Sequence, residues 1–560
     1  MESLVLSGFI RKALFIELIA KFFRLTVEKC TELSSLTDSL TNDKKKRKFT
    51  ISGRNNTVRA GRINAKRAKE GMHTPTDCFS LAGMGITRIV ACHRRISLRL
   101  TMPATFTKSL AWRLAWLAGL LLFGTLVGRA DTHYVWRDNP APVSPYTNGW
   151  ASASTQIQAA VDAAVDGDTV LVTNGTYDTG GKVTPSYALT NRVCITKSIT
   201  VRSFNNDPAN TIIKGAPDAG TGGCGPAAVR CVRMQGGASL SGFTLTDGHT
   251  LTNGNTTLER SGGSVLLHYG GTVSNCVISG NKASYNAGGA EFVGAALVSG
   301  GTMSNCTLTA NFADLCGGGA NFHVGGTMNN CTLNCNTSNA GGGLHFYGGG
   351  AMNNCTLSNN VSLANGGGVY NTYTDKGQMS NCLLVANQAS GNGGGVWLRY
   401  NDEASALTLN NCLLIGNIAV NGGNVYFSGD GTLCGTLNNC TLAAGSSGVY
   451  MDNGGAMTNC IVWGNTNYDI SIATTGKVSY TCSGGTKPPG EGNITNNPQL
   501  VNTNAGNYRL ASSSPCVNTG TNQAWMTNAV DLDGRIRIRY GMVDMGAYEL
   551  VYKGSVFSFQ

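Results

Sequence analysis

One short phrase, Asn-Cys followed by an aliphatic strand and a second Asn, recurs through the middle of the chain and constrains its fold more than any other feature. It is clearest at 352–360, Met-Asn-Asn-Cys-Thr-Leu-Ser-Asn-Asn. Its cysteine returns every 20 to 30 residues, at Cys276, Cys306, Cys331, Cys355, Cys382, Cys412, Cys440 and Cys460. Units of this length cannot bury an apolar face alone and must stack on one another, so the phrase predicts a solenoid.

The positions around each cysteine indicate short strands. A large apolar residue stands three positions before it, as at Met352, and another two positions after it, as at Leu357. Side chains two apart share one face of a strand, so the cysteine and the aliphatic residue after it should both face inward. The three-residue step from Met to Cys needs a bend, and Asn tolerates the left-handed backbone of a bend. We expect a second Asn corner five residues after the cysteine, at Asn281, Asn311, Asn336, Asn360, Asn387, Asn417 and Asn465.

A glycine run and a third short strand follow the second Asn. Examples of this strand are 344–346, 369–371, 396–398 and 425–427, whose first and third residues are mostly apolar. Three strands per coil, with coils stacked at roughly 4.8 Å, predict an all-β parallel β-helix. A leucine-rich repeat is the rival architecture, but the glycine runs would break its helix.

The charge of the chain lies in its first 101 residues, which carry 20 Lys and Arg against 8 Asp and Glu, while residues 102–560 carry 22 against 23. From Met102 the chain reads as a secretory signal peptide, with the apolar run 114–127 and small residues before Asp131. That run is too short to span a bilayer comfortably, so we expect no integral membrane span in the mature chain. We interpret Met102 as the true start. The balanced charge of the remainder argues against a nucleic-acid partner.

The mature chain begins with a candidate cap. Residues 156–165 place Ile157, Ala160, Val161 and Ala164 at helical spacing, and a helix there would cover the open end of the core. We divide the chain into an upstream extension without a fold (1–101), a signal peptide (102–130), a cap with the first coils (131–197), the β-helix (198–485) and a C-terminal module (486–560).

Sixteen of the 19 cysteines follow the signal peptide and would meet an oxidising compartment. Neighbours in the repeated column would have parallel side-chain vectors, which give poor disulfide torsions, so we expect buried thiols there. Cys224 with Cys231, or Cys331 with Cys335, are better placed for bridges across loops.

The mature chain resembles the right-handed parallel β-helix proteins of the pectate-lyase-like superfamily. The phrase 384–389 followed by 393–396 is similar to the repeat of chlamydial polymorphic outer-membrane proteins, with Leu384 where that repeat usually has Phe. The tail resembles a C-terminal module of exported bacterial β-helix proteins, in the motifs 497–500, 508–510, 514–517, 531–534 and 543–549. The resemblance implies a right-handed solenoid with a short N-terminal capping helix and a small C-terminal module. It implies little about chemistry, because this fold hosts lyases, hydrolases and adhesins.

The repeats offer few groups for catalysis. Residues 271–480 hold eight acids, and none forms the carboxylate pair that a glycosidase needs or the acidic cluster that a calcium-dependent lyase needs. We therefore predict no metal site and no cofactor, and we assign no catalytic residue. The sequence 531–534, Asp-Leu-Asp-Gly, has too few acids for a calcium loop and is interpreted as a turn.

A binding face is predicted from the middle residue of each third strand, which should point outward. This column runs Glu291, Asn321, His345, Tyr370, Trp397, Tyr426 and Tyr450. Longer loops follow the strands of Trp397 and Tyr426, and insertions in a solenoid tend to build its binding face. We predict a glycan site centred on Trp397, with Tyr370 and Tyr426 stacking and with Arg399 and Asp402 as polar contacts. The alternative interpretation is that these rings only pack on each other or under loops.

These patterns favour an exported β-helix, secreted or held at the cell envelope, that binds polysaccharides or cell-surface glycans as a monomer. The alternative is a polysaccharide lyase or a glycoside hydrolase. The sequence leaves the question of enzymatic activity open.

Overall fold

The computed structural model describes residues 130–295, 299–372, 377–399, 406–429 and 434–551. Within residues 1–101 it also describes four strands. β1 (Ile51–Gly53) pairs with β2 (Asn56–Val58), and β3 (Arg88–Cys92) pairs with β4 (Arg95–Arg99), both antiparallel. The chain divides into the units Met1–Val127 and Gly128–Gln560. The predicted signal peptide lies outside the described residues, apart from Ala130.

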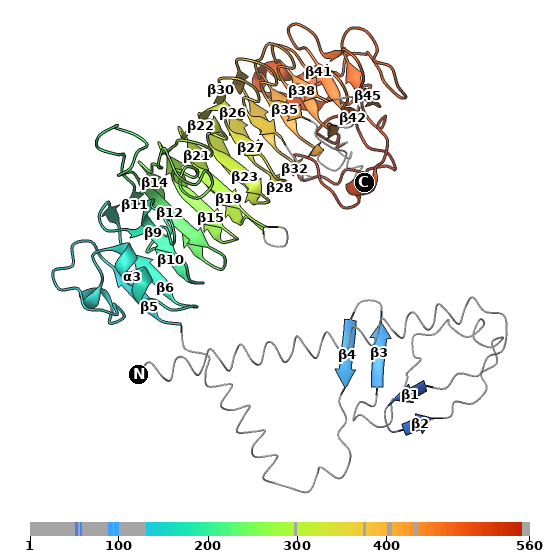
Figure 1. Cartoon of the computed structure of the whole chain (residues 1–560). Coiled ribbons are helices and arrows are strands. Elements are labelled where there is room, and N and C mark those ends of the chain that lie inside the picture. Colours follow the sequence, from blue (N-terminus) through green and yellow to red (C-terminus); the bar gives the residue numbers. More distant parts are fainter. Residues whose placement is uncertain are drawn as a thin grey trace, which may run out of the picture. The chain divides into compact units, whose positions relative to one another are not determined.

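The second unit is a right-handed parallel β-helix whose coils stack in sequence order (Figure 1), with the hand that parallel crossovers adopt in nearly all proteins. Each coil contributes one strand to each of three long sheets. The first sheet contains β5 (Thr132–Val135), β6 (Thr169–Val172), β10 (Thr200–Ser203), β13 (Ser239–Ser241), β16 (Thr272–Ser274), β20 (Thr302–Ser304), β24 (Thr327–Asn329), β28 (Gly350–Asn353), β32 (Gly377–Ser380), β36 (Leu407–Asn410), β39 (Gly435–Asn438), β42 (Ala456–Thr458) and β45 (Lys477–Ser479). The second sheet contains β7 (Gly175–Tyr177), β11 (Thr211–Lys214), β14 (Thr244–Thr246), β17 (Val277–Ser279), β21 (Thr307–Thr309), β25 (Thr332–Asn334), β29 (Thr356–Ser358), β33 (Leu383–Val385), β37 (Leu413–Ile415), β40 (Thr441–Ala443), β43 (Ile461–Trp463) and β46 (Cys482–Ser483).

The third sheet carries the face on which the sequence places the glycan site. It contains β8 (Lys182–Val183), β9 (Thr190–Ile195), β12 (Val229–Gln235), β15 (Val265–His268), β19 (Ala290–Val293), β23 (Ala320–Val324), β27 (Leu344–Phe346), β31 (Val369–Asn371), β35 (Val396–Arg399), β38 (Val425–Ser428), β41 (Val449–Met451) and β44 (Ile470–Ile472). All strand pairs of these sheets are parallel except β8 with β9. The predicted parallel β-helix is confirmed.

Five central coils have a fourth strand that the repeat did not predict. This sheet contains β18 (Lys282–Ala283), β22 (Phe312–Cys316), β26 (Thr337–Ala340), β30 (Val361–Ser362) and β34 (Gln388–Ala389). The segments are only two to five residues long, so they show no alternation in the sequence. They form because the strands on either side already hold successive coils at pairing distance.

The interior is one continuous apolar column. The predicted cysteine column is confirmed, since Cys306, Cys331, Cys355 and Cys382 are all at most 1% exposed and lie in this core. Burial among apolar groups raises the pKa of the Cys382 thiol. The predicted bridges are wrong: Cys224, Cys231, Cys331 and Cys335 are all free, and Cys331 lies in the interior while Cys335 is exposed.

The first Asn corner is confirmed by its backbone, and the second is not. Asn305, Asn330, Asn354 and Asn381 have φ values of 53°, 53°, 54° and 55°, the left-handed conformation that Asn tolerates. At the second corner the left-handed residue is the one before the Asn. The second Asn faces inward instead. From Asn281 to Asn387 each side-chain Nδ2 donates to the Oδ1 of the next coil's Asn, as from Asn336 to Asn360 at 3.0 Å. This asparagine ladder satisfies polar groups that the corner would otherwise bury.

The N-terminal cap is the helix α3 (Ile157–Ala163), shorter than the predicted span because Ala164 is already extended. Its buried residues Ile157, Ala160 and Val161 join the core of the first coils. The structure adds β5 before the helix, and β5 pairs in parallel with β6 as the first strand of the first sheet.

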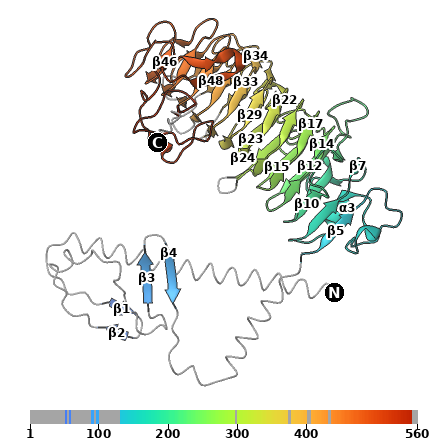
Figure 2. The same cartoon turned by 180° about the vertical axis from the view of Figure 1, so that it is seen from behind.

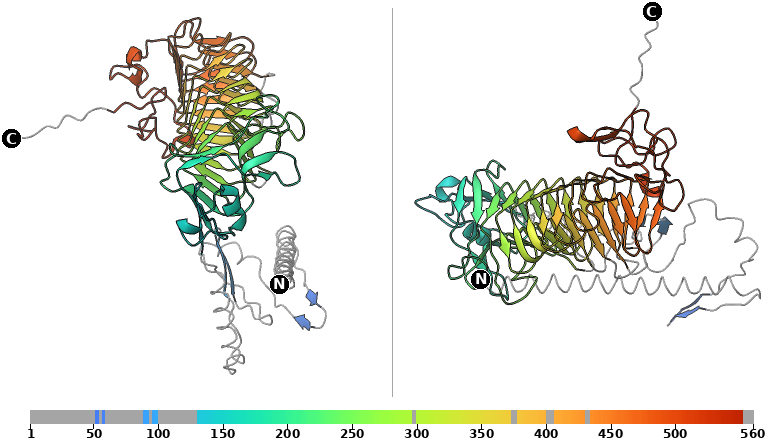
Figure 3. Two further views of the ribbon diagram at one scale, coloured as in Figure 1. Left: turned by 90° about the vertical axis from the view of Figure 1, so that its left-hand side faces the viewer. Right: turned by 90° about the horizontal axis from the view of Figure 1, so that it is seen from above.

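The C-terminal module lies against the flank of the last coils, as Figures 2 and 3 show. It contains β47 (Leu500–Asn502), the 3-10 turns η3 (Thr503–Ala505) and η4 (Ala524–Met526), and β48 (Asn507–Leu510). Tyr508 and Tyr548 pack on Leu413 and Ala443 of the second sheet. Segment 531–534 is the predicted turn, because Asp531 Oδ1 accepts from the backbone N–H groups of residues 533 and 535, both under 3.0 Å.

Candidate functional site

The outer column of the third sheet aligns as the sequence predicts. Strand register places Glu291, Asn321, His345, Tyr370, Trp397, Tyr426 and Tyr450 on successive strands at one level. Two parallel ring pairs form along it. The rings of Tyr370 and Trp397 are 4.6 Å apart with an interplanar angle of 11°. Those of Tyr426 and Tyr450 are 5.3 Å apart at 4°.

Two of these rings are buried, which agrees with the alternative interpretation that the rings pack on each other or under loops. Trp397 is 7% exposed and Tyr426 is 8% exposed. The glycine runs explain part of this burial, since they approach the column closely. A Cβ at Gly341 would lie 2.9 Å from the Tyr370 Cβ, and a Cβ at Gly393 would lie 2.8 Å from the Trp397 Cβ. Sequence periodicity shows which face a residue lies on, whereas coverage depends on how the chain passes over that face.

The polar partners predicted around Trp397 are only partly described. Arg399 ends β35 and is exposed, while Asp402 lies in the segment 400–405, outside the described residues. Tyr370 is half-buried. Burial raises the pKa of Tyr426, and the nearby Asp452 carboxylate raises it further. The glycan site centred on Trp397 stays a prediction.

The other end of the same column is a buried polar cluster. Glu291 is fully buried, and its Oε1 accepts from the Asn321 amide at 2.8 Å. Burial raises the pKa of Glu291 well above its ordinary value, and burial together with the neighbouring His323 lowers the pKa of His345 to about 3. Burial therefore disfavours the charged form of both side chains. Within the described part of the chain, no three His, Cys, Asp or Glu side chains are placed to hold a metal ion.

A second aromatic surface lies beside the cap, and the repeat gave no sign of it. Val135, Val172 and Ser203 are in register at the ends of β5, β6 and β10. The next residue on each strand is Trp136, Thr173 or Phe204, and backbone hydrogen bonds continue the register through Thr173 and Phe204. These three residues therefore form a row across adjacent coils.

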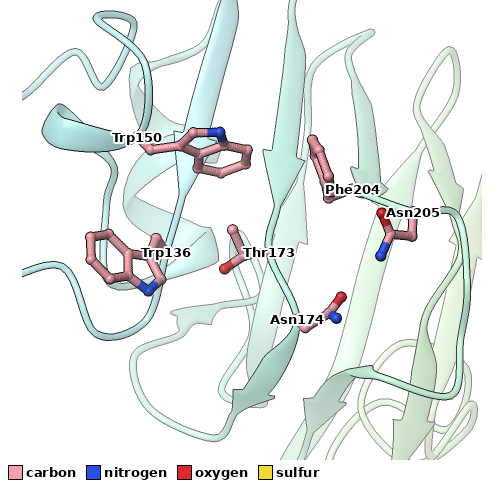
Figure 4. Close-up of a pocket in the computed structure, with 6 residues that line it drawn as sticks. All are labelled: Trp136, Trp150, Thr173, Asn174, Phe204 and Asn205. Atoms are coloured by element: carbon pink, nitrogen blue, oxygen red, sulfur yellow. The ribbon is translucent and has the colours of Figure 1, made fainter.

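Trp150 completes this surface from the 3-10 turn η2 (Trp150–Ser152). Its ring meets Phe204 edge-on at 5.6 Å and Tyr134 edge-on at 4.8 Å. The result is an open groove of about 510 Å³ lined by Trp136, Trp150, Thr173, Asn174, Phe204 and Asn205. Figure 4 shows the two tryptophans facing Phe204 across Thr173. We call this the aromatic groove.

The aromatic groove differs from the column near Trp397 in being accessible. Trp136 is 37% exposed and Phe204 is 52% exposed, and exposed apolar side chains that are grouped in one patch indicate an interaction site. Its lining contains hydroxyl and amide groups but no charged side chain. The sequence signal for it was weak, because Trp136 and Phe204 stand in irregular coils that lack the cysteine phrase.

No described helix is long and apolar enough to cross a membrane. No family model matches the chain, and no curated protein matches it either. Solved structures with a similar arrangement include pectate lyase Pel9A, at 13% identity and a TM-score of 0.40, with 76% of this chain and 98% of that one covered. XylC in complex with xylose has 9% identity and a TM-score of 0.39, with 76% and 99% covered. The alginate lyase AlyGC has 12% identity and a TM-score of 0.34, with 60% and 51% covered. At these values the likenesses bear on neither substrate nor activity.

Proposed function

We propose that this chain is an exported β-helix protein that binds a neutral glycan in the aromatic groove. The observation that carries the proposal is the groove itself: three aromatic rings line an open space of about 510 Å³ together with Thr173 and two asparagines. Sugar rings have apolar faces and polar rims, so they suit flat aromatic walls beside hydroxyl and amide groups. The predicted signal peptide supports export.

The row geometry fits one sugar ring between two aromatic walls. Trp136 and Phe204 are two strands apart in the row, a spacing of about 10 Å. Van der Waals contacts on both faces of an inserted ring need about 3.5–4.0 Å each. The amides of Asn174 and Asn205 each offer donors and an acceptor to the ring hydroxyls.

The absence of charge from the lining favours a neutral glycan over an acidic one. A uronate carboxylate brought into the groove would lose water without gaining a cation in exchange. Among the described residues nearby, Arg137 is already within 3.7 Å of the Asp178 carboxylate. We therefore expect neutral polysaccharides to bind more tightly than acidic ones.

The test is affinity electrophoresis of the full chain through gels containing xylan, glucan or mannan, with polygalacturonate and alginate as acidic comparisons. Trp136→Ala and Phe204→Ala should each weaken neutral-glycan retention by roughly fivefold, the equivalent of about 1 kcal/mol for one stacking contact. Tyr269→Ala is the matched control, because Tyr269 is 42% exposed and lies outside the groove. Equal retention of all variants, or retention only by acidic glycans, would refute the proposal. Release of reducing ends would favour the alternative, a lyase or hydrolase.

A further inference from the structure

Two cysteines meet where the C-terminal module packs on the solenoid. Cys482 belongs to the last strand of the second sheet, and Cys516 belongs to the module. Both are fully buried, in an apolar cluster with Ile461, Leu510 and Met545. In this structure both carry free thiols that pack in this one cluster, and the Cys482 thiol donates to the Asn496 carbonyl at 3.2 Å.

Cys482 is not part of the interior cysteine column. It pairs with Ile461, which faces the module, whereas the column continues from Cys460 to Thr481, whose hydroxyl accepts from the Cys460 N–H. Cys482 therefore points out of the solenoid. The Cys516 backbone is fixed opposite it, because its carbonyl accepts from the Met545 N–H at 3.0 Å.

This arrangement suits a disulfide better than the column does. Neighbours in the column, such as Cys440 and Cys460, stand on adjacent parallel strands with parallel side-chain vectors, and each thiol donates to a backbone carbonyl of the coil before. Parallel vectors give poor torsions about the S–S bond. Cys482 and Cys516 come from two separate segments that pack across an interface, so the parallel geometry of the column does not apply to them.

We propose that Cys482 and Cys516 are the site of a disulfide that fastens the C-terminal module to the last coil of the exported protein. The proposal rests on the export proposed above, because only an oxidising compartment sustains such a bond. The chemistry is thiol–disulfide exchange with an external disulfide. One thiolate attacks that disulfide and the second cysteine resolves the mixed disulfide, so the two protein thiols lose two protons and two electrons and the external disulfide becomes two thiols.

Burial sets when the bond forms. An external disulfide cannot reach either sulfur in the docked state, since both are 0% exposed. Exchange must therefore take place before the module docks or while it is detached. The folded, reduced protein should resist oxidation, and the oxidised protein should resist reduction unless it is first unfolded.

The experiment refolds the full chain in a buffer of oxidised and reduced glutathione and maps its cysteines by mass spectrometry without reduction. Trypsin releases the peptides 478–509 and 510–535, each with a single cysteine. A crosslinked pair, lighter by about 2 Da than the two peptides together because two hydrogens are lost, is the expected result. Absence of this pair in wild-type protein, with Cys482 and Cys516 both free, overturns the inference.

Two further experiments distinguish a failure of the disulfide proposal from a failure of the proposed export. Cys516→Ser should abolish the crosslinked pair, and Cys440→Ser should leave it intact. Wild-type protein that has been unfolded and refolded in dithiothreitol should lose its module to proteolysis faster than wild-type protein refolded in the glutathione buffer. Cys516→Ser should be cut at the same rate after either treatment. An equal effect of dithiothreitol on both proteins would count against the fastening role. If the pair forms in buffer but is missing from protein isolated from its native source, the geometry stands and the export proposal fails.

Discussion

The asparagine ladder allows the stability of one coil to be predicted from its hydrogen bonds. Asn360 is fully buried at the centre of the ladder. Its Oδ1 accepts from both the backbone N–H and the side-chain amide of Asn336, each at 3.0 Å. Its Nδ2 donates to the Leu333 carbonyl and to Asn387 Oδ1, each at 2.9 Å. Asn360→Leu keeps the side-chain size and removes all four bonds.

The cost follows from the groups left without partners. Two Asn336 donors lose their acceptor inside a region that water cannot reach, and each buried unsatisfied group costs about 1–3 kcal/mol. The substitution should therefore destabilise the coil by roughly 2–6 kcal/mol. A central value of about 4 kcal/mol corresponds to roughly a thousandfold increase in the open population of that coil.

Hydrogen–deuterium exchange of the full chain measures this locally, which suits a solenoid because each coil contacts only its neighbours. Amides of residues 333–338 and 356–362 should exchange faster in Asn360→Leu, while those of 200–245 should not change. Asn339→Leu is the control, since Asn339 is an exposed residue on a neighbouring strand. If both variants exchange alike, the ladder contributes little and the reasoning fails.

Two further predictions concern the third sheet and the module. Trp397→Ala should lower the free energy of unfolding by about 3–5 kcal/mol because the ring is 7% exposed; a thermal midpoint equal to wild type would mean that the ring is free. The hydrogen bond from Arg509 lowers the pKa of Asp533, so this pair stabilises the module above the unfolded pKa of about 3.9 and the stabilisation is lost as pH falls through the lower folded value. Asp533→Asn should remove that acid sensitivity in limited proteolysis of the module, and an unchanged pH profile would contradict the assignment.

The core could be predicted because every coil repeats the same constraint. Met352, Cys355 and Leu357 recur at fixed spacing, and only one arrangement buries all three columns at once. The second Asn was misassigned because the same residue type suits two roles, a left-handed corner and a buried hydrogen-bonding group. Residue preference alone cannot separate these roles. The position just before it, occupied by Gly280, Ala310, Cys335 or Asn359, takes the left-handed backbone.

The candidate site was harder to predict for a related reason. The outward direction of Trp397 follows from the two-residue period of a strand, and the structure has it on the expected face. Its burial depends on the glycine run of its own coil and on neighbouring rings, which are contacts that a period does not encode. Trp136 and Phe204 belong to the first coils, where no repeat exists to align them.

Placement of the accessible aromatics outside the regular coils follows from how the solenoid is stabilised. In a regular coil each outer side chain has identical backbone above and below it at about 4.8 Å, so a large ring stacks on its neighbour, as Tyr370 does on Trp397. A ring whose face is covered by a neighbouring ring is poorly available to a ligand. At the N-terminal end the row alternates Trp136, Thr173 and Phe204. The small residue separates the two rings, so they do not stack on each other and both stay partly exposed, which is the condition that a bound sugar requires.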